Sequence, residues 1–373
     1  QVASGISTFQ AITATTIVSS STINGLSVGK GANSVSTNTV LGSSALDASV
    51  TGGNNTAIGY DALTTNTTGQ ANSAVGSRSL EDTTTGSHNT AVGYQAMQLN
   101  TTASNNTAVG SGSLYDNTTG TRNTAIGAFA VENNTVSDNT GVGYFALNAN
   151  TTGASNVAVG AYALDANTTA NANTAVGRDA LTANTTGTAN VAVGKDALKA
   201  NVTHSNNTAL GAFALEYNTA AGNTAVGEVS ANKNTTGTEN TALGFKSFYD
   251  NTTGAYNTAL GTYALEDNTT ANYNVAVGYK ASQLNTTGTT NTSVGSFAMQ
   301  ANTTGDSNTA VGYSALDANT TANNNTAVGR SALGANTTGS NNTAMGMNCL
   351  DANTTGAENV AIGQAALGAN TTG

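Results

Sequence analysis

The chain has 373 residues, of which 8 % are charged, and it contains 43 glycines but no proline or tryptophan. An enzyme of this length normally carries about 25 % charged residues, so the composition argues against that class. The net charge of −10 includes no basic stripe, so we do not expect a nucleic-acid partner. No apolar run approaches the ~20 residues of a membrane span, which argues against membrane insertion.

Residues 1–37 differ from the rest of the chain. Between Gln1 and Ile23 the sequence is rich in β-branched residues and lacks the regular Asn and Gly spacing that follows. This composition predicts one or two strands. Because a stack of coils leaves an unpaired strand at its end, we expect this segment to cap the first coil, attach the protein to a base or join subunits.

Residues 38–373 consist of one unit that recurs every 17 residues. The unit reads Asn-Thr-Ala-Val-Gly-x-x-Ala-Leu-x-x-Asn-Thr-Thr-Gly-x-x, and its first Asn is called position 1 throughout. Twenty units begin within this range, and the last is incomplete. One residue is missing from the unit at Asn123 and another from the unit at Asn207.

The unit is too short for two packed helices and contains poor helix formers. It suffices for two short strands, at positions 1–5 and roughly 7–11. The Gly at position 5 marks a bend, and the Asn-Thr-Thr-Gly block marks a turn. The sequence therefore predicts an all-β fold, a parallel β-solenoid or β-roll of about twenty 17-residue coils.

Stacked coils place each repeated residue above its own copy. We expect a structural ladder of Asn at position 1 and Gly at position 5, and a core column of aliphatic residues at positions 4 and 9. The ladder residues are Asn55, Asn72, Asn89, Asn106, Gly59, Gly76, Gly93 and Gly110, and the core residues are Ile58, Val75, Val92, Val109, Leu63 and Leu80.

The strand at positions 1–5 is apolar on both faces, because Ala at position 3 and Val at position 4 alternate. One face fills the coil, and the other needs a cover. Other copies of the chain are the simplest cover, so we expect a homotrimer or a helical homopolymer.

Two sets of side chains are candidates for contact with other molecules. Asn-x-Thr acceptor patterns on the turn make Asn66, Asn117 and Asn251 candidate glycosylation sites, although Asn and Thr are also ordinary turn residues. Aromatic residues near the bend either pack between chains or form a surface-binding stripe; they include Tyr60, Tyr94, Tyr144, Tyr279 and Tyr313. We find no catalytic constellation, no metal-ligand spacing and no cofactor motif.

The units, such as Asn89 to Ala96 (Asn-Thr-Ala-Val-Gly-Tyr-Gln-Ala), resemble the head repeats of trimeric autotransporter adhesins. They also resemble phage tail-fibre repeats that include the Asn-Thr-Thr-Gly block. The resemblance covers residues 38–373. It implies a left-handed β-roll, three chains per assembly, contact with host-surface or matrix glycans, and an extracellular, cell-surface or virion location.

These observations predict a non-enzymatic structural protein, an adhesin or tail-fibre shaft that mediates surface attachment. The alternative is a self-polymerising extracellular filament subunit. That alternative is suggested by the last coil, which ends at Gly373 inside a turn and without a cap. Head-to-tail stacking through the N-terminal segment would then build an open filament.

Overall fold

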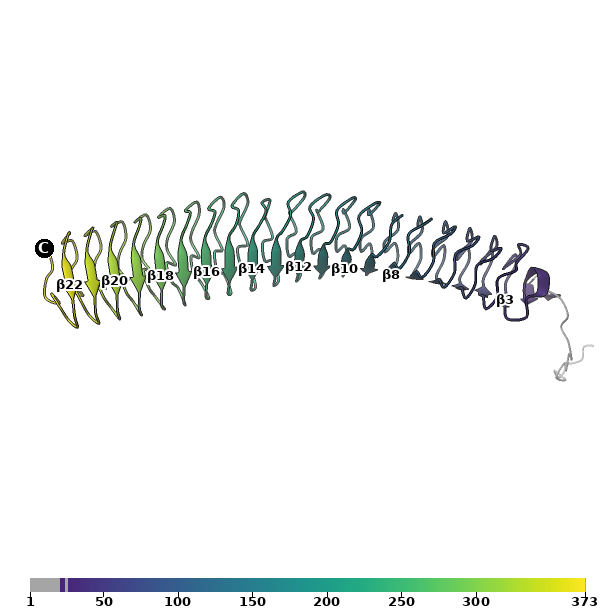
Figure 1. The fold of residues 1–373 in the computed structure, drawn as a ribbon, viewed down its shortest axis with the longest axis horizontal. Helices are drawn as coiled ribbons and strands as arrows, with labels where there is room; N and C mark the ends of the chain where they lie inside the picture. Colours follow the sequence, from purple (N-terminus) through teal and green to yellow (C-terminus); the bar gives the residue numbers. More distant parts are fainter. Residues whose placement is uncertain (1–20, 24–25, 373) are drawn as a thin grey trace, which may run out of the picture. The chain divides into compact units, whose positions relative to one another are not determined.

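The computed structural model describes residues 21–23 and 26–372 and divides the chain into two compact units, residues 1–123 and 124–373. In each unit the coils stack one on the next (Figure 1). Much of the predicted N-terminal segment, residues 1–20 and 24–25, lies outside the described residues. Its role and its boundary at residue 37 stay predictions.

The first unit contains seven strands and one short 3₁₀ helix among its described residues, and the second contains fifteen strands. In the first unit these are β1 Ser21–Ile23, β2 Leu26–Gly29, η1 Ala32–Ser34, β3 Thr39–Leu41, β4 Thr56–Ile58, β5 Ser73–Val75, β6 Thr90–Val92 and β7 Thr107–Val109. In the second they are β8 Thr124–Ile126, β9 Thr140–Val142, β10 Val157–Val159, β11 Thr174–Val176, β12 Val191–Val193, β13 Thr208–Leu210, β14 Thr224–Val226, β15 Thr241–Leu243, β16 Thr258–Leu260, β17 Val275–Val277, β18 Thr292–Val294, β19 Thr309–Val311, β20 Thr326–Val328, β21 Thr343–Met345 and β22 Val360–Ile362.

Strand pairing confirms the predicted parallel β-solenoid. Within each of the two compact units, from β3 onward, a strand pairs in parallel with the strand of the next coil, so that Thr56 lies opposite Ser73. Each of these strands covers positions 2–4 of the 17-residue repeat, so it is shorter than the predicted strand at positions 1–5. Before the first coil, β2 pairs antiparallel with β3, and this contact covers an edge that would otherwise be open.

The second half of each coil, where the sequence predicts a second short strand, also forms hydrogen bonds from coil to coil. The backbone N–H of Leu63 donates to the carbonyl of Ser79, and that of Thr65 donates to the carbonyl of Glu81. Its backbone departs from regular strand geometry, because Asp61 and Leu63 have positive φ values of 55°. A regular strand would turn one of positions 8 and 9 outward. The left-handed residues instead let Ala62 and Leu63 both face the interior, where neither is exposed.

The shortened unit at Asn207 keeps this register. Thr208 lies opposite Thr224 even though only 16 residues separate them. The missing residue falls in the turn after position 12, where Asn218 donates to the carbonyl of Ala220, two residues away. In regular coils the equivalent bond spans three residues, as from Asn167 to Ala170. The turn therefore absorbs the deletion, and the strands stay aligned.

The predicted core column at position 4 is wrong within a single chain. Ala57 at position 3 is fully buried, whereas Ile58 is partly exposed and Val92 is 38 % exposed. The other predicted residues of that column, Val75 and Val109, also lie on the outer face, while Leu63 and Leu80 at position 9 lie in the interior. The reason is the narrow interior of the coil: the residue at position 9, usually Leu, fills most of it, so the buried position 3 is Ala in most coils.

The core assignment predicts opposite responses at two neighbouring residues of β11. Replacing buried Ala175 with Leu overpacks the interior, and we expect the free energy of unfolding to fall by about 1–3 kcal/mol. Val176→Leu should be tolerated, because the outer face already accommodates leucine at Leu210 and Leu243. Thermal and urea unfolding, followed by circular dichroism, compare the two variants. Equal destabilisation by both would contradict the assignment.

Candidate functional site

The Asn at position 1 connects neighbouring coils. In the first unit, the Oδ1 of Asn55 accepts a hydrogen bond from the backbone N–H of Asn72 over 2.9 Å. The Nδ2 of Asn55 donates to the carbonyl of Gly69, in the turn of its own coil, over 2.9 Å. Asn72, Asn89 and Asn106 repeat this arrangement. The ladder therefore forms mainly between amide side chains and the backbone, and direct bonds between the amides occur in only some coils, such as Asn308 to Asn291.

The Asn at position 12 forms the amide-to-amide ladder in the second unit. The Nδ2 of Asn167 donates to the Oδ1 of Asn150 over 2.8 Å, and the Nδ2 of Asn184 donates to the Oδ1 of Asn167 over 3.0 Å. Each Nδ2 also donates to the carbonyl at position 15 of its own coil. These amides are fully buried, so their hydrogen bonds replace the contacts that water would make.

Burial corrects the interpretation of the glycosylation patterns. Asn66, Asn117 and Asn251 occupy position 12, and none has exposed surface. The Nδ2 of each donates to a backbone carbonyl, as from Asn66 to Gly69 over 3.1 Å. A glycan would have to be attached to this same nitrogen. In the folded chain these residues are therefore not acceptor sites, and the Asn-Thr-Thr-Gly block serves the ladder.

The Gly at position 5 allows adjacent coils to approach closely. Gly59 has a φ of 137°, in a region that favours glycine. A Cβ on Gly59 would lie 2.4 Å from the carbonyl oxygen of Gly76, which is the equivalent residue one coil further on. Any side chain here would push the coils apart. Gly76, Gly93 and Gly110 occupy the same position in the next three coils, as the sequence predicted.

The predicted aromatic residues separate into two groups. Tyr279 and Tyr313 belong to a row of ring contacts on successive coils, and Tyr144 contacts Phe145 and Tyr162. Tyr60 and Tyr94, each 52 % exposed, have no ring contact among the described residues. The row also includes Phe245 and Tyr263, which sequence reasoning missed. Five consecutive units with an aromatic residue at position 6 or 7 were the available signal.

The outer face of the strands is formed by positions 2 and 4. Position 2 is mostly Thr, and Thr174 and Thr208, for example, are partly exposed. Position 4 is aliphatic or Met, and Leu243, for example, is 51 % exposed. We call this surface the outer strand face. It presents the same two kinds of side chain, mostly Thr at position 2 and an aliphatic residue or Met at position 4, in coil after coil.

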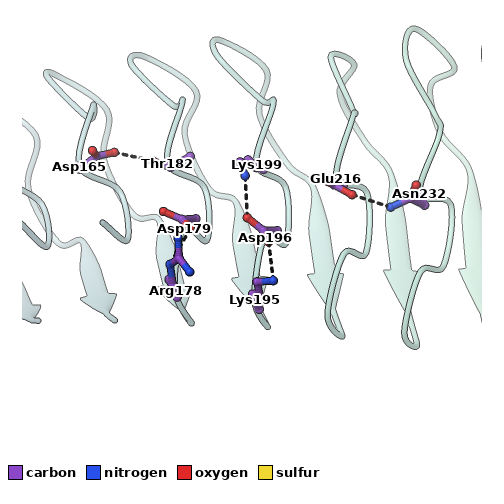
Figure 2. Close-up of polar contacts among 9 residues, drawn as sticks. All are labelled: Asp165, Arg178, Asp179, Thr182, Lys195, Asp196, Lys199, Glu216 and Asn232. Carbon is purple, nitrogen blue, oxygen red and sulfur yellow. Dashed lines mark hydrogen bonds and ion pairs between the residues drawn. The ribbon is translucent and has the colours of Figure 1, made fainter. Parts of the chain in front are cut away.

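A second surface, the lateral face, carries the side chains at positions 6, 7 and 10. In the part drawn in Figure 2 it is charged. Asp196 accepts from Lys199 over 2.8 Å and pairs with Lys195 at 3.5 Å, and Arg178 pairs with Asp179 at 3.0 Å. The cations therefore compensate two carboxylates that lie in neighbouring coils.

Position 10, which varies freely in the sequence, follows a rule in the structure. Several of its carboxylates are followed in the next coil by a donor, as when Thr182 donates to Asp165 over 2.6 Å and Asn232 donates to Glu216 over 3.0 Å (Figure 2). No two acidic residues occupy position 10 in adjacent coils of the second unit. Stacked like charges would repel at the strand spacing of about 4.8 Å.

Burial raises the pKa of several carboxyl groups in the second unit. Desolvation raises the pKa of Asp165, and the hydrogen bond from Thr182 partly offsets this effect. Desolvation is also the main cause of the raised pKa of Asp267, and the nearby Glu266 and Asp250 raise it further. The ionised form of Asp267 is therefore less favourable in the folded chain than in the unfolded one.

Comparison with known protein families and with curated proteins found no match to this chain. Within the described residues there is no helix long and apolar enough to cross a bilayer. The same part of the chain contains no group of three or more His, Cys, Asp or Glu residues suited to hold a metal ion.

The position-1 ladder predicts that Asn173→Asp is destabilising. The Nδ2 of buried Asn173 donates to the carbonyl of Gly187 over 2.8 Å, and a carboxylate would lose this bond and face the carbonyl. We expect the free energy of unfolding, measured in urea, to fall by about 1–3 kcal/mol. Asn171→Asp is the matched control, since exposed Asn171 only accepts a bond, from the backbone of Ala154. If the two variants have the same free energy of unfolding, the position-1 ladder does not provide this stabilisation.

The raised pKa of Asp267 predicts a pH-dependent gain from Asp267→Asn. Because the folded pKa lies above the unfolded one, the carboxylate costs stability at pH 7, and this cost disappears as pH falls through the folded pKa. We expect the variant to be more stable at pH 7, by less than about 1 kcal/mol because solvent screens this partly exposed group, and equal in stability to the unmodified chain near pH 3. Glu239→Gln, on an exposed turn, is the control. A gain that persists at pH 3 would be incompatible with this explanation.

Proposed function

We propose that the protein is a non-enzymatic structural component of an extracellular, cell-surface or virion fibre that mediates attachment to a surface. The observation that carries the proposal is the outer strand face, which repeats from coil to coil in both compact units and is covered by none of the described residues. The low charge and the close sequence agreement between the 17-residue repeats fit a role that depends on the repeated shape of the coils more than on one binding or catalytic site.

The outer strand face supports assembly with copies of the same chain. In the second unit, fifteen consecutive strands each present an aliphatic residue or Met at position 4. Contiguous apolar surface on this scale is rare on monomers and marks interaction sites. A column of side chains that recurs at the strand spacing is matched best by a column of the same period, which another copy provides.

We propose a homotrimer in which three outer strand faces pack around a common axis and enclose their position-4 columns. The partly exposed Thr at position 2 borders these columns. Wrapping three thin coils around one axis would give each coil a second apolar core, which a single narrow coil lacks. A helical homopolymer is the alternative assembly, and in it the same face would be covered along a filament.

Mass measurement tests this assembly. We expect the full chain to elute in light scattering at three times its mass of 36.7 kDa, and to appear as thin fibres of uniform width in negative stain. The double variant Leu210→Asn and Leu243→Asn should lower the mass toward that of one chain, because it places amides in the apolar interface. Val202→Asn is the control, since Val202 is exposed on a turn away from this face.

A monomer at all concentrations would reject the assembly, and indefinitely long polymers would favour the filament alternative. A surface location further requires that antibodies against the coils label intact cells or particles without permeabilisation.

A further inference from the structure

The lateral face becomes aromatic in the coils that begin at Asn240 and end before Asn325. One ring from each of five successive coils contacts the next, with centroid separations of 5.7, 6.1, 5.4 and 5.8 Å. We call this row the aromatic ladder; it consists of Phe245, Tyr263, Tyr279, Phe297 and Tyr313.

The ladder alternates between two positions of the unit. Phe245, Tyr279 and Tyr313 are at position 6 and are 38–54 % exposed, whereas Tyr263 and Phe297 are at position 7 and are less exposed. Neighbouring rings meet at interplanar angles of 73–88°. The position-7 rings therefore brace the more exposed position-6 rings. Two strand spacings separate one position-6 ring from the next, a distance of about 10 Å.

A row of polar side chains accompanies the ladder at position 10. Gln283 donates to Glu266 over 2.7 Å, and Gln300 donates to the Oε1 of Gln283 over 3.0 Å. This row adjoins position 7, because Lys246 at position 7 lies 3.8 Å from Glu266 at position 10 of the next coil. The surface thus combines fixed rings with amide and carboxylate groups that are already oriented.

Two lysines add hydrogen-bond donors to the same surface. The Nζ of Lys280 lies 5.8 Å from the ring centroid of Tyr263 and 5.6 Å from that of Tyr279. The Nζ of Lys246 lies 5.9 Å from the ring centroid of Phe245. Both lysines occupy position 7 in coils whose position 6 is aromatic. An aromatic ring with a lysine beside it therefore recurs after two coils, first as Phe245 with Lys246 and then as Tyr279 with Lys280.

The shape of the ladder favours a narrow ligand over a protein partner. The exposed parts of its five rings offer on the order of 400 Å², whereas a stable protein interface buries about 800 Å² per partner. A ligand that fits must be extended, must repeat along its length, and must carry both apolar faces and hydroxyl groups. An extended chain of β-1,4-linked pyranoses has these properties, and every second sugar presents the same face at close to the spacing of the position-6 rings.

We propose that the aromatic ladder binds a linear glycan of β-1,4-linked pyranoses that lies along successive coils. The axial C–H groups of alternate sugars rest on Phe245, Tyr279 and Tyr313, while the sugar hydroxyls bond to the position-10 amides and to Lys280. This inference rests on the proposed attachment function, because it names the chemistry of the surface to be bound.

Isothermal titration calorimetry on the full chain, with cellohexaose as the probe, tests the proposal. We expect binding that weakens about tenfold or more in the double variant Tyr279→Ala and Tyr313→Ala, which removes two of the three position-6 rings. The matched control is Tyr60→Ala with Tyr94→Ala, which removes two exposed position-6 rings outside the ladder. Maltohexaose, whose α-linked chain is curved, should bind at least tenfold more weakly than cellohexaose.

Three results would overturn the proposal: no binding of cellohexaose, equal binding of both oligosaccharides, or equal losses in the two double variants. A fourth would be a change of oligomeric mass in the ladder variant with its cellohexaose affinity intact, since the rings would then pack between chains. The titration is independent of assembly. A monomer that binds cellohexaose through the ladder would reject the proposed trimer and leave this inference standing.

Discussion

In most coils, the buried Asn at position 1 accepts a hydrogen bond from the backbone of the next coil and donates another to the turn of its own coil, as Asn173 does with Asn190 and Gly187. A buried amide with an unmet donor or acceptor is costly, so a slip of one residue between coils would be penalised in every coil at once. This constraint fixes the register. Once the register is fixed, every other position of the unit must be compatible with its own copy above and below.

The same register limits what the interior can hold. Gly59 and Gly76 lie so close that neither tolerates a side chain, and the narrow interior of the coil mostly pairs Ala at position 3 with Leu at position 9. The larger aliphatic residues of the strands therefore face outward. A thin coil thus produces an apolar outer strand face that the described residues leave uncovered.

Positions that do not contribute to the interior are free to vary, but only in combinations that stack. On the lateral face, Asp179 and Asp196 occupy neighbouring coils together with Arg178, Lys195 and Lys199. At position 10, the carboxylates of Asp165 and Glu216 are each followed by a donor in the next coil. Further along the second unit the same face carries rings. One scaffold can therefore present different chemistry in different coils without any change in the backbone.

The sequence by itself determined the period, the parallel stacking, the Asn and Gly ladders and the bend at position 5, because each follows from the repetition of residue types with strict backbone or hydrogen-bond requirements. Only the tertiary structure decided which side of the strand is the interior. Ala57 and Ile58 are both apolar and adjacent, and alternation says only that they point in opposite directions. The choice depends on how much of the interior the second half of the coil fills, and there left-handed residues such as Asp61 and Leu63, which no composition rule identifies, let positions 8 and 9 both face inward. For the same reason, only the structure showed that Asn66 points inward, since a turn residue can direct its amide to either side of the backbone.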